Sequence, residues 1–138
     1  FYQIYEGASF LAGAEPVFLN CTKDNNYLPD FDNVDEQTWQ HCQVLVICTP
    51  GNPTGAVIPK ETLVKLIALA DKHDFIIASD ECYSEIYFDE ATPPVGLLEA
   101  CASIGARRLW TFQRNLSLDC YCQWLFCSRA CRYTVAYP

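Results

Sequence analysis

The chain has 138 residues, of which 51% are apolar and 19% charged, and its formal net charge is −8. This length and composition fit one globular domain with a real core rather than a disordered chain. The negative charge argues against nucleic acid or an anionic membrane as a partner. No apolar run approaches the roughly 20 residues of a membrane span, so a soluble protein is expected. No signal peptide is recognised. The chain starts at Phe1, inside sequence that already reads as structured, so an N-terminal part is expected to be missing.

The predicted elements begin with a helix over Tyr2–Ala12, which Gly13 closes as a C-cap. A short strand is predicted over Pro16–Cys21. The polar stretch Lys23–Asp35 predicts a loop. The continuous apolar run Gln43–Cys48 is typical of a strand buried on both faces of a parallel sheet.

A second helix is predicted to begin near Pro59 and to stop near His73. Its apolar positions share one face: Leu63, Leu66, Ile67 and Ala70. Phe75–Ser79 predicts a second buried strand. Strand, helix and strand at this spacing predict a right-handed βαβ unit, and hence an α/β fold.

Residues 106–138 differ from those before them. They hold all five arginines, no lysine, no glycine and a single acid, Asp119. A stretch of this length in an α/β protein normally needs glycine for turns and helix ends. We therefore divide the chain into a partial domain over 1–105 and an atypical tail over 106–138. A shift of reading frame near Ala106–Thr111 is the favoured explanation of the tail, and a cysteine-rich extension is the alternative.

The nine cysteines fall into two groups. Five are scattered singly through apolar surroundings, as buried free thiols of a cytoplasmic protein would be: Cys21, Cys42, Cys48, Cys82 and Cys101. Four crowd into the tail and could offer thiolates to zinc: Cys120, Cys122, Cys127 and Cys131. Their spacing is not the usual pair of C-x2-C knuckles, so no metal site is predicted.

Two segments follow the predicted strands, where ligands collect in open α/β sheets. In Thr49–Gly55, two prolines and two glycines fix the backbone and hold Asn52 in place. In Ser79–Tyr83, Asp80 follows a buried strand and needs a cationic partner, for which a protonated ring nitrogen would serve. Tyr83 could reach the same ligand. The alternatives are a mere strand-to-helix turn for the first segment and, for the second, an aspartate that N-caps the following turn.

The segments PGNPTG and SDECYSEIYFDE together are similar to the class I/II aminotransferases of fold type I, which depend on pyridoxal phosphate. The resemblance covers about Phe1 to Gly105. It implies part of the family's large domain, a mainly parallel sheet with helices on both faces. It also implies a cytoplasmic homodimer that acts on small-molecule amino acids and keto acids.

The resemblance assigns roles to individual residues. Asn52 and Tyr83 would hydrogen-bond the phenolic oxygen of the cofactor, and Asp80 would pair with its pyridinium nitrogen, which keeps the ring an electron sink. Tyr2, in the segment Phe1–Tyr5, would stack on the ring, with core packing as the alternative. The bond between Asn52 and the proline after it would be cis.

Within the family, YQIYEGASFLAGAEPVFLNC and DECYSEIYFDEATPP look most like bacterial succinyldiaminopimelate aminotransferases. Those enzymes act in lysine biosynthesis and exchange an amino group with glutamate and 2-oxoglutarate. Aminotransferases for aspartate, alanine or aromatic amino acids, and some β-lyases, share the two motifs.

The family's Schiff-base lysine would fall near Asn115–Asp119, yet no lysine follows Lys72. The lysines of the connecting helix are expected on its solvated face: Lys60, Lys65 and Lys72. The tail arginines receive no role: Arg107, Arg108, Arg114, Arg129 and Arg132. Covalent catalysis needs its lysine, so no catalytic residue is assigned and the chain is expected to be inactive alone.

The alternative function is a non-catalytic degenerate fragment, or an interaction remnant, with at most weak cofactor binding.

An acidic run also follows the second motif: Glu81, Glu85 and Asp89. Solvated surface is the favoured interpretation of this run, over metal binding.

Overall fold

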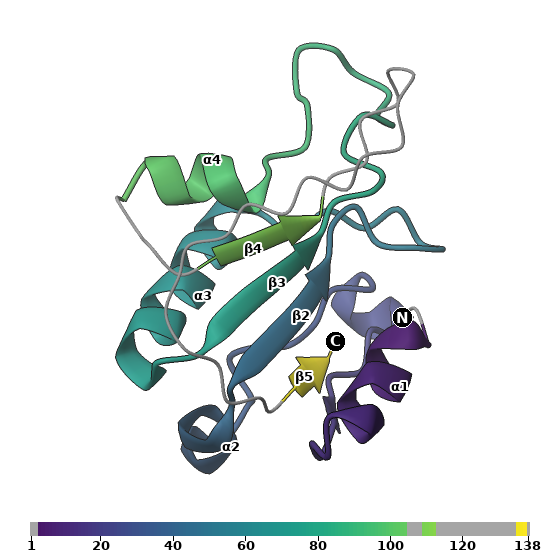
Figure 1. Cartoon of the computed structure of the whole chain (residues 1–138). Coiled ribbons are helices and arrows are strands. Elements are labelled where there is room, and N and C mark those ends of the chain that lie inside the picture. Colours follow the sequence, from purple (N-terminus) through teal and green to yellow (C-terminus); the bar gives the residue numbers. More distant parts are fainter. Residues whose placement is uncertain (1–2, 105–108, 113–134, 138) are drawn as a thin grey trace.

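The computed structural model describes residues 3–104, 109–112 and 135–137. They form a sheet of five parallel strands in the order β1-β5-β2-β3-β4, with helices on both faces (Figure 1). The strands are β1 Val17–Phe18, β2 Val44–Cys48, β3 Ile76–Asp80, β4 Leu109–Phe112 and β5 Val135–Tyr137. The helices are α1 Ile4–Leu11, the 3-10 turn η1 Lys23–Asn25, α2 Glu36–His41, α3 Lys60–His73 and α4 Leu97–Ala102. The predicted α/β class with a mainly parallel sheet is confirmed.

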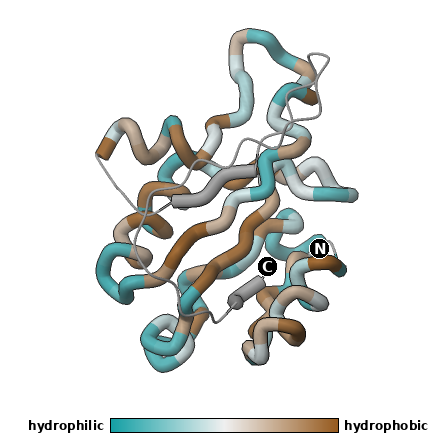
Figure 2. Tube along the Cα trace, in the orientation of Figure 1, coloured by the Kyte–Doolittle hydropathy of each residue, from teal (hydrophilic) through white to brown (hydrophobic). Residues whose placement is uncertain are grey.

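The centre of the sheet is the predicted unit of β2, α3 and β3. β2 and β3 pair in parallel from Val44 opposite Ile76 to Cys48 opposite Asp80. Figure 2 shows the apolar colour running along these two strands. Four of the five β2 residues are buried, as a strand covered on both faces requires. β3 alternates instead, with Ile77 and Ser79 buried and their neighbours only partly covered.

The main core lies between the sheet and one layer made of α2, α3 and α4 (Figure 1). The predicted apolar face of α3 is buried there, at 0–2% exposure: Leu63, Leu66, Ile67 and Ala70. Trp39 of α2 stacks on Phe75, just before β3, with ring centroids 5.5 Å apart. Burial of such large apolar side chains is the main favourable contribution to the stability of this layer.

The other face of the sheet is covered by α1. Tyr5 and Ala14 pack there against Val44 and Val46 of β2. Much of α1 points outward: Ile4 is 59% exposed, Phe10 61% and Leu11 92%. Gly13, at a φ of 71°, accepts the left-handed conformation that ends the helix.

Several predicted elements need correction. The first strand covers only Val17–Phe18, and α2 and α4 were not predicted. The loop prediction for Lys23–Asp35 was right except for the short turn η1. The five described cysteines were expected to be buried, but Cys21 is exposed, Cys48 and Cys82 are partly buried, and only Cys42 and Cys101 are buried. None of the helices in the described part of the chain is long and apolar enough to cross a membrane.

The division into 1–105 and 106–138 remains a prediction. Within the tail the structure describes only the strands β4 and β5, which pair with β3 and with β1 and β2. The four clustered cysteines, the five arginines and the Asn115–Asp119 segment lie outside the described residues.

Candidate functional site

The two segments singled out in the sequence meet at the carboxyl ends of β2 and β3. Cys48 lies opposite Asp80 in the sheet register, and the backbone N–H of Thr49 donates to the carbonyl of Asp80 over 3.0 Å. The two strand ends are therefore tied together at the positions from which both segments depart. In parallel sheets this edge is where ligands bind.

The turn after β2 is closed by its own hydrogen bonds. The N–H of Gly51 donates to the carbonyl of Ala56 over 2.8 Å, and that of Gly55 to the carbonyl of Gly51. Gly55 has a φ of 71°, a conformation that other residues adopt only under strain. Buried Thr49 accepts from the N–H of Ile58 at 3.0 Å, which anchors the far end of the turn.

The turn contains two cis peptide bonds, Thr49–Pro50 and Asn52–Pro53. The second confirms the expectation from the resemblance. With the backbone closed in this way, the Asn52 side chain is left exposed at the tip.

Asn52 and Tyr83 are brought into direct contact. The Nδ2 of Asn52 donates to the Tyr83 hydroxyl at 3.2 Å, across 31 positions of the chain. Both residues line an open groove of about 720 Å³ between the turn and the loop after β3. Two polar groups from different segments thus converge on one place, where they can share an oxygen of a ligand.

Asp80 ends β3 and faces the α1 side of the sheet. Its Oδ2 accepts from the Tyr5 hydroxyl and its Oδ1 from the backbone N–H of Cys82 at 3.2 Å. No lysine or arginine in the described part of the chain forms an ion pair with it. The expected bound cation therefore stays a prediction, and in this structure a phenol stands beside the carboxylate.

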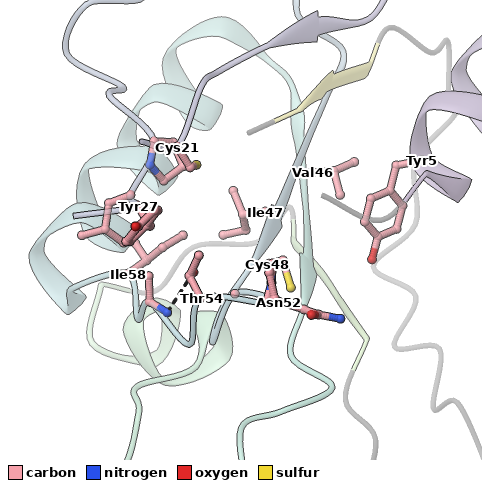
Figure 3. Close-up of a pocket in the computed structure, with 14 residues that line it drawn as sticks. Tyr5, Cys21, Tyr27, Val46, Ile47, Cys48, Asn52, Thr54 and Ile58 are labelled. Carbon is pink, nitrogen blue, oxygen red and sulfur yellow. Dashed lines mark hydrogen bonds between the residues drawn. The ribbon is translucent and has the colours of Figure 1, made fainter. Parts of the chain in front are cut away.

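Tyr5 is a site residue that the sequence reasoning missed. It belongs to α1, is half-buried, and lines a cavity of about 150 Å³ together with Cys48 and Asn52 (Figure 3). Burial raises the pKa of its phenol far above the usual value, and the hydrogen bond to Asp80 and the charge of Asp80 raise it further. Its place three residues after Tyr2, one helical turn on, is the signal that could have found it.

The thiol of Cys48 stands beside this cluster. It donates to the carbonyl of Pro50 at 3.5 Å, and burial raises its pKa, so the neutral thiol is favoured.

Three further expectations have mixed outcomes. Tyr2 lies outside the described residues, so its stacking role remains a prediction. Lys65 and Lys72 of α3 are exposed, as expected, whereas Lys60 is only partly exposed and lines the groove. All three pair with acids on neighbouring segments: Lys60 with Glu99, Lys65 with Asp32 and Lys72 with Glu36. The interpretation of Glu81 as solvated surface was wrong, because its side chain turns inward and is only 3% exposed.

The donor set suits one edge of a pyridoxal phosphate ring. Asp80 supplies a carboxylate that forms no ion pair with a lysine or arginine among the described residues. Asn52 and Tyr83 supply an amide and a phenol that can hydrogen-bond an oxygen. The described residues include no arginine for the phosphate group, since all five arginines lie outside them.

Residues 1–107 match the family described as aminotransferase class I and II, and the chain belongs to this family. The family uses pyridoxal phosphate. The match includes both segments of the site and every described helix.

Relatives of known name support the same assignment. An LL-diaminopimelate aminotransferase from Maridesulfovibrio salexigens is 37% identical over 98 residues, which are 71% of this chain and 25% of that protein. The chain thus spans about a quarter of the length of such relatives.

Solved structures of aminotransferases resemble this chain as well. An aminotransferase from Neisseria meningitidis is 44% identical with a TM-score of 0.74, over 83% of this chain and 29% of that one. A probable N-succinyldiaminopimelate aminotransferase from Thermus thermophilus is 26% identical with a TM-score of 0.71, over 81% of this chain and 29% of that one.

Proposed function

We propose that this chain carries the ring-binding edge of a pyridoxal-phosphate-dependent aminotransferase. In this assignment Asp80 pairs with the protonated ring nitrogen, while Asn52 and Tyr83 hydrogen-bond the phenolic oxygen. The observation that carries the proposal is the contact of 3.2 Å between Asn52 and Tyr83 at the strand edge that also holds Asp80.

When bound, the cofactor supplies an electron sink for breaking bonds at the α-carbon of an amino acid. In this proposal, the residues of this chain keep the ring protonated and correctly oriented, so that it can accept those electrons. A carboxylate beside the ring nitrogen favours its protonated form, because opposite charges close together stabilise each other. The amide of Asn52 and the phenol of Tyr83 orient the ring and stabilise negative charge on its oxygen.

As it stands, the chain would bind the ring without covalent attachment and would not complete transamination. Covalent catalysis needs a lysine near the cofactor, and no lysine follows Lys72. Each lysine of α3 forms an ion pair with an acid of a neighbouring segment, including Lys60, which lines the groove beside Asn52 and Tyr83 but pairs with Glu99. This absence favours the second candidate function, a non-catalytic product with weak cofactor binding.

For the substrate, we propose a diaminopimelate-type amino acid in lysine biosynthesis, with glutamate and 2-oxoglutarate as the exchanging pair and a homodimer as the active form. The curated relatives' names favour LL-diaminopimelate itself. The sequence likeness and one structural relative favour the N-succinyl derivative. A protein that joins these residues to the missing lysine would decide between them by its kcat/KM for each.

Ring binding is tested with pyridoxine phosphate, which has the same ring but no aldehyde to react with surface lysines. Tryptophan and tyrosine fluorescence would follow the titration. We expect the chain to bind, and Asp80→Asn and Asn52→Ala each to weaken binding by about tenfold, the loss of one charge-assisted or well-placed hydrogen bond. Asp71→Asn, an exposed acid on α3, is the matched control. Equal affinities for the chain and for Asp80→Asn would refute the assignment.

A further inference from the structure

Next to Asp80 stands a buried carboxylate, Glu81, that the ring-binding assignment does not use. Its side chain is 3% exposed. The Oε1 atom accepts from the Ser79 hydroxyl at 2.8 Å and from the backbone N–H of Leu97, the first residue of α4, at 2.7 Å. Glu81 thus joins the end of β3 to a helix that begins 16 positions later.

Asp80 and Glu81 hold the strand end from opposite sides. Asp80 contacts Tyr5 of α1 on one face of the sheet, and Glu81 contacts Leu97 of α4 on the other. Asp80 is the last residue of β3 and Glu81 follows it directly, so an anchor at Glu81 limits how the backbone at Asp80 can turn. The backbone direction in turn sets where the Asp80 carboxylate can point.

Gly96 lacks a side chain at the place where the Glu81 carboxylate lies. A Cβ added at Gly96 would lie 2.7 Å from Oε2 of Glu81, closer than such atoms approach in real proteins. The φ of Gly96 is −82°, which any residue can adopt, so backbone freedom does not explain the glycine. The requirement is room for the carboxylate.

The cost of this arrangement argues for a purpose beyond packing. A buried carboxylate is expensive, and in the described part of the chain Glu81 forms no ion pair with a lysine or arginine. The two donors that the described residues offer it, the Ser79 hydroxyl and the Leu97 N–H, are neutral. An apolar residue would fill the same space at lower cost, but it could not tie Ser79 and Leu97 to one point.

We propose that Glu81 is a positioning residue for the cofactor ring: anchored by Leu97 and given room by Gly96, it holds Asp80 in the direction that meets the ring nitrogen. The inference rests on the proposed function for its ligand. The geometry that it asserts, a dependence of Asp80 on Glu81, exists without the ligand and can be tested without it.

The experiment compares Glu81→Ala, Glu81→Gln and Gly96→Ala, with Glu85→Ala as an exposed control on the same segment. Pyridoxine phosphate affinity is expected to fall by about tenfold in Glu81→Ala and Gly96→Ala. Glu81→Gln keeps an acceptor oxygen for both donors and should stay within about threefold of the parent chain. The double variant of Glu81→Ala and Gly96→Ala should be no worse than either single change, because both act through one carboxylate.

A second readout separates positioning from general stability. The ¹³Cζ resonance of Tyr5 reports its contact with Asp80, so loosening Asp80 should lower the pKa of Tyr5 in Glu81→Ala and Gly96→Ala but not in Glu85→Ala. A merely structural role would lower the melting temperature and leave the titration of Tyr5 in place.

The outcomes distinguish the two proposals. If the parent chain binds no pyridoxine phosphate, the proposed function fails, and the Tyr5 titration still decides the role of Glu81. If Gly96→Ala folds and leaves both ligand affinity and Tyr5 titration at parent values, the inference about Glu81 is overturned. Gly96→Ala keeps the Glu81 carboxylate, so the measurement on this variant still tests the inference if Glu81→Ala does not fold.

Discussion

The Tyr5 hydroxyl donates a hydrogen bond to Oδ2 of Asp80, although 75 positions of the chain separate the two residues. The contact joins α1 to the end of β3 through the less protected face of the sheet. It places a neutral phenol against the carboxylate that is assigned to the cofactor nitrogen. The bond therefore keeps Asp80 in place while no ligand is bound.

This bond predicts a loss of stability at alkaline pH. The pKa of Tyr5 in the folded chain lies above its ordinary value of about 10, because of burial and then because of Asp80. The protonated phenol is favoured by folding, so its contribution is fully present below about pH 10 and is lost as the pH rises further. Urea midpoints measured from neutral pH upward should fall beyond that point.

Two variants check the cause. Tyr5→Phe should remove this part of the alkaline loss, since it has no phenol to ionise. Asp80→Asn should reduce it, because the nearby charge and the ionic acceptor disappear while burial remains. A Tyr5 resonance that titrates at its ordinary pKa in the parent chain would contradict the prediction.

A second prediction concerns the turn that carries Asn52. Gly55 and Gly13 both have a φ of 71°, and an added Cβ would meet no atom within 4 Å at either position. Gly55→Ala and Gly13→Ala should therefore each cost about 1–2 kcal/mol of unfolding free energy through the backbone alone. Of these two glycines, only Gly55 lies in the turn, where its N–H donates to the carbonyl of Gly51. Only Gly55→Ala should therefore also weaken pyridoxine phosphate binding.

Urea denaturation and the ligand titration measure the two effects separately. Gly13→Ala serves as the matched control, since it carries the same backbone cost at the end of α1, away from the turn. Unchanged ligand affinity in Gly55→Ala would show that the turn does not position Asn52.

The central fold could be predicted because its signals are local. The apolar runs of β2 and β3 and the one-sided pattern of α3 each lie within a few consecutive residues. α2 was missed because it has six residues and buries only Trp39. Its start signal was nonetheless present: Asp35 caps the helix by accepting from the N–H of Thr38 at 2.8 Å.

The residues of the candidate site also divide into those with a local sequence signal and those without one. Asn52, Asp80 and Tyr83 could be predicted as candidates because two compact segments mark the ends of two strands. Tyr5 and Glu81 were not found, because their roles depend on partners in other segments, Asp80 and Leu97. A glutamate within an acidic run looks solvated until the fold shows which side of the strand it leaves.

The third prediction concerns the buried hydroxyl that anchors the turn to α3. Thr49 is 2% exposed, and its Oγ1 accepts from the N–H of Ile58 at 3.0 Å. Thr49→Val keeps the shape but leaves that N–H buried without an acceptor, which should cost about 1–3 kcal/mol of unfolding free energy. Thr49→Ser keeps the oxygen and loses one methyl group, for about 1 kcal/mol.

Thr54→Val is the matched control, since Thr54 accepts from the N–H of Ala56 at 3.3 Å in an exposed position where water can replace the lost oxygen. We expect it to stay within about 0.5 kcal/mol of the parent chain. Hydrogen exchange provides a local measurement, because the Ile58 amide should lose protection in Thr49→Val and keep it in Thr49→Ser. If Thr49→Val were as stable as Thr54→Val, with the Ile58 amide still protected, another acceptor would hold that N–H, and the anchor of the turn would lie elsewhere.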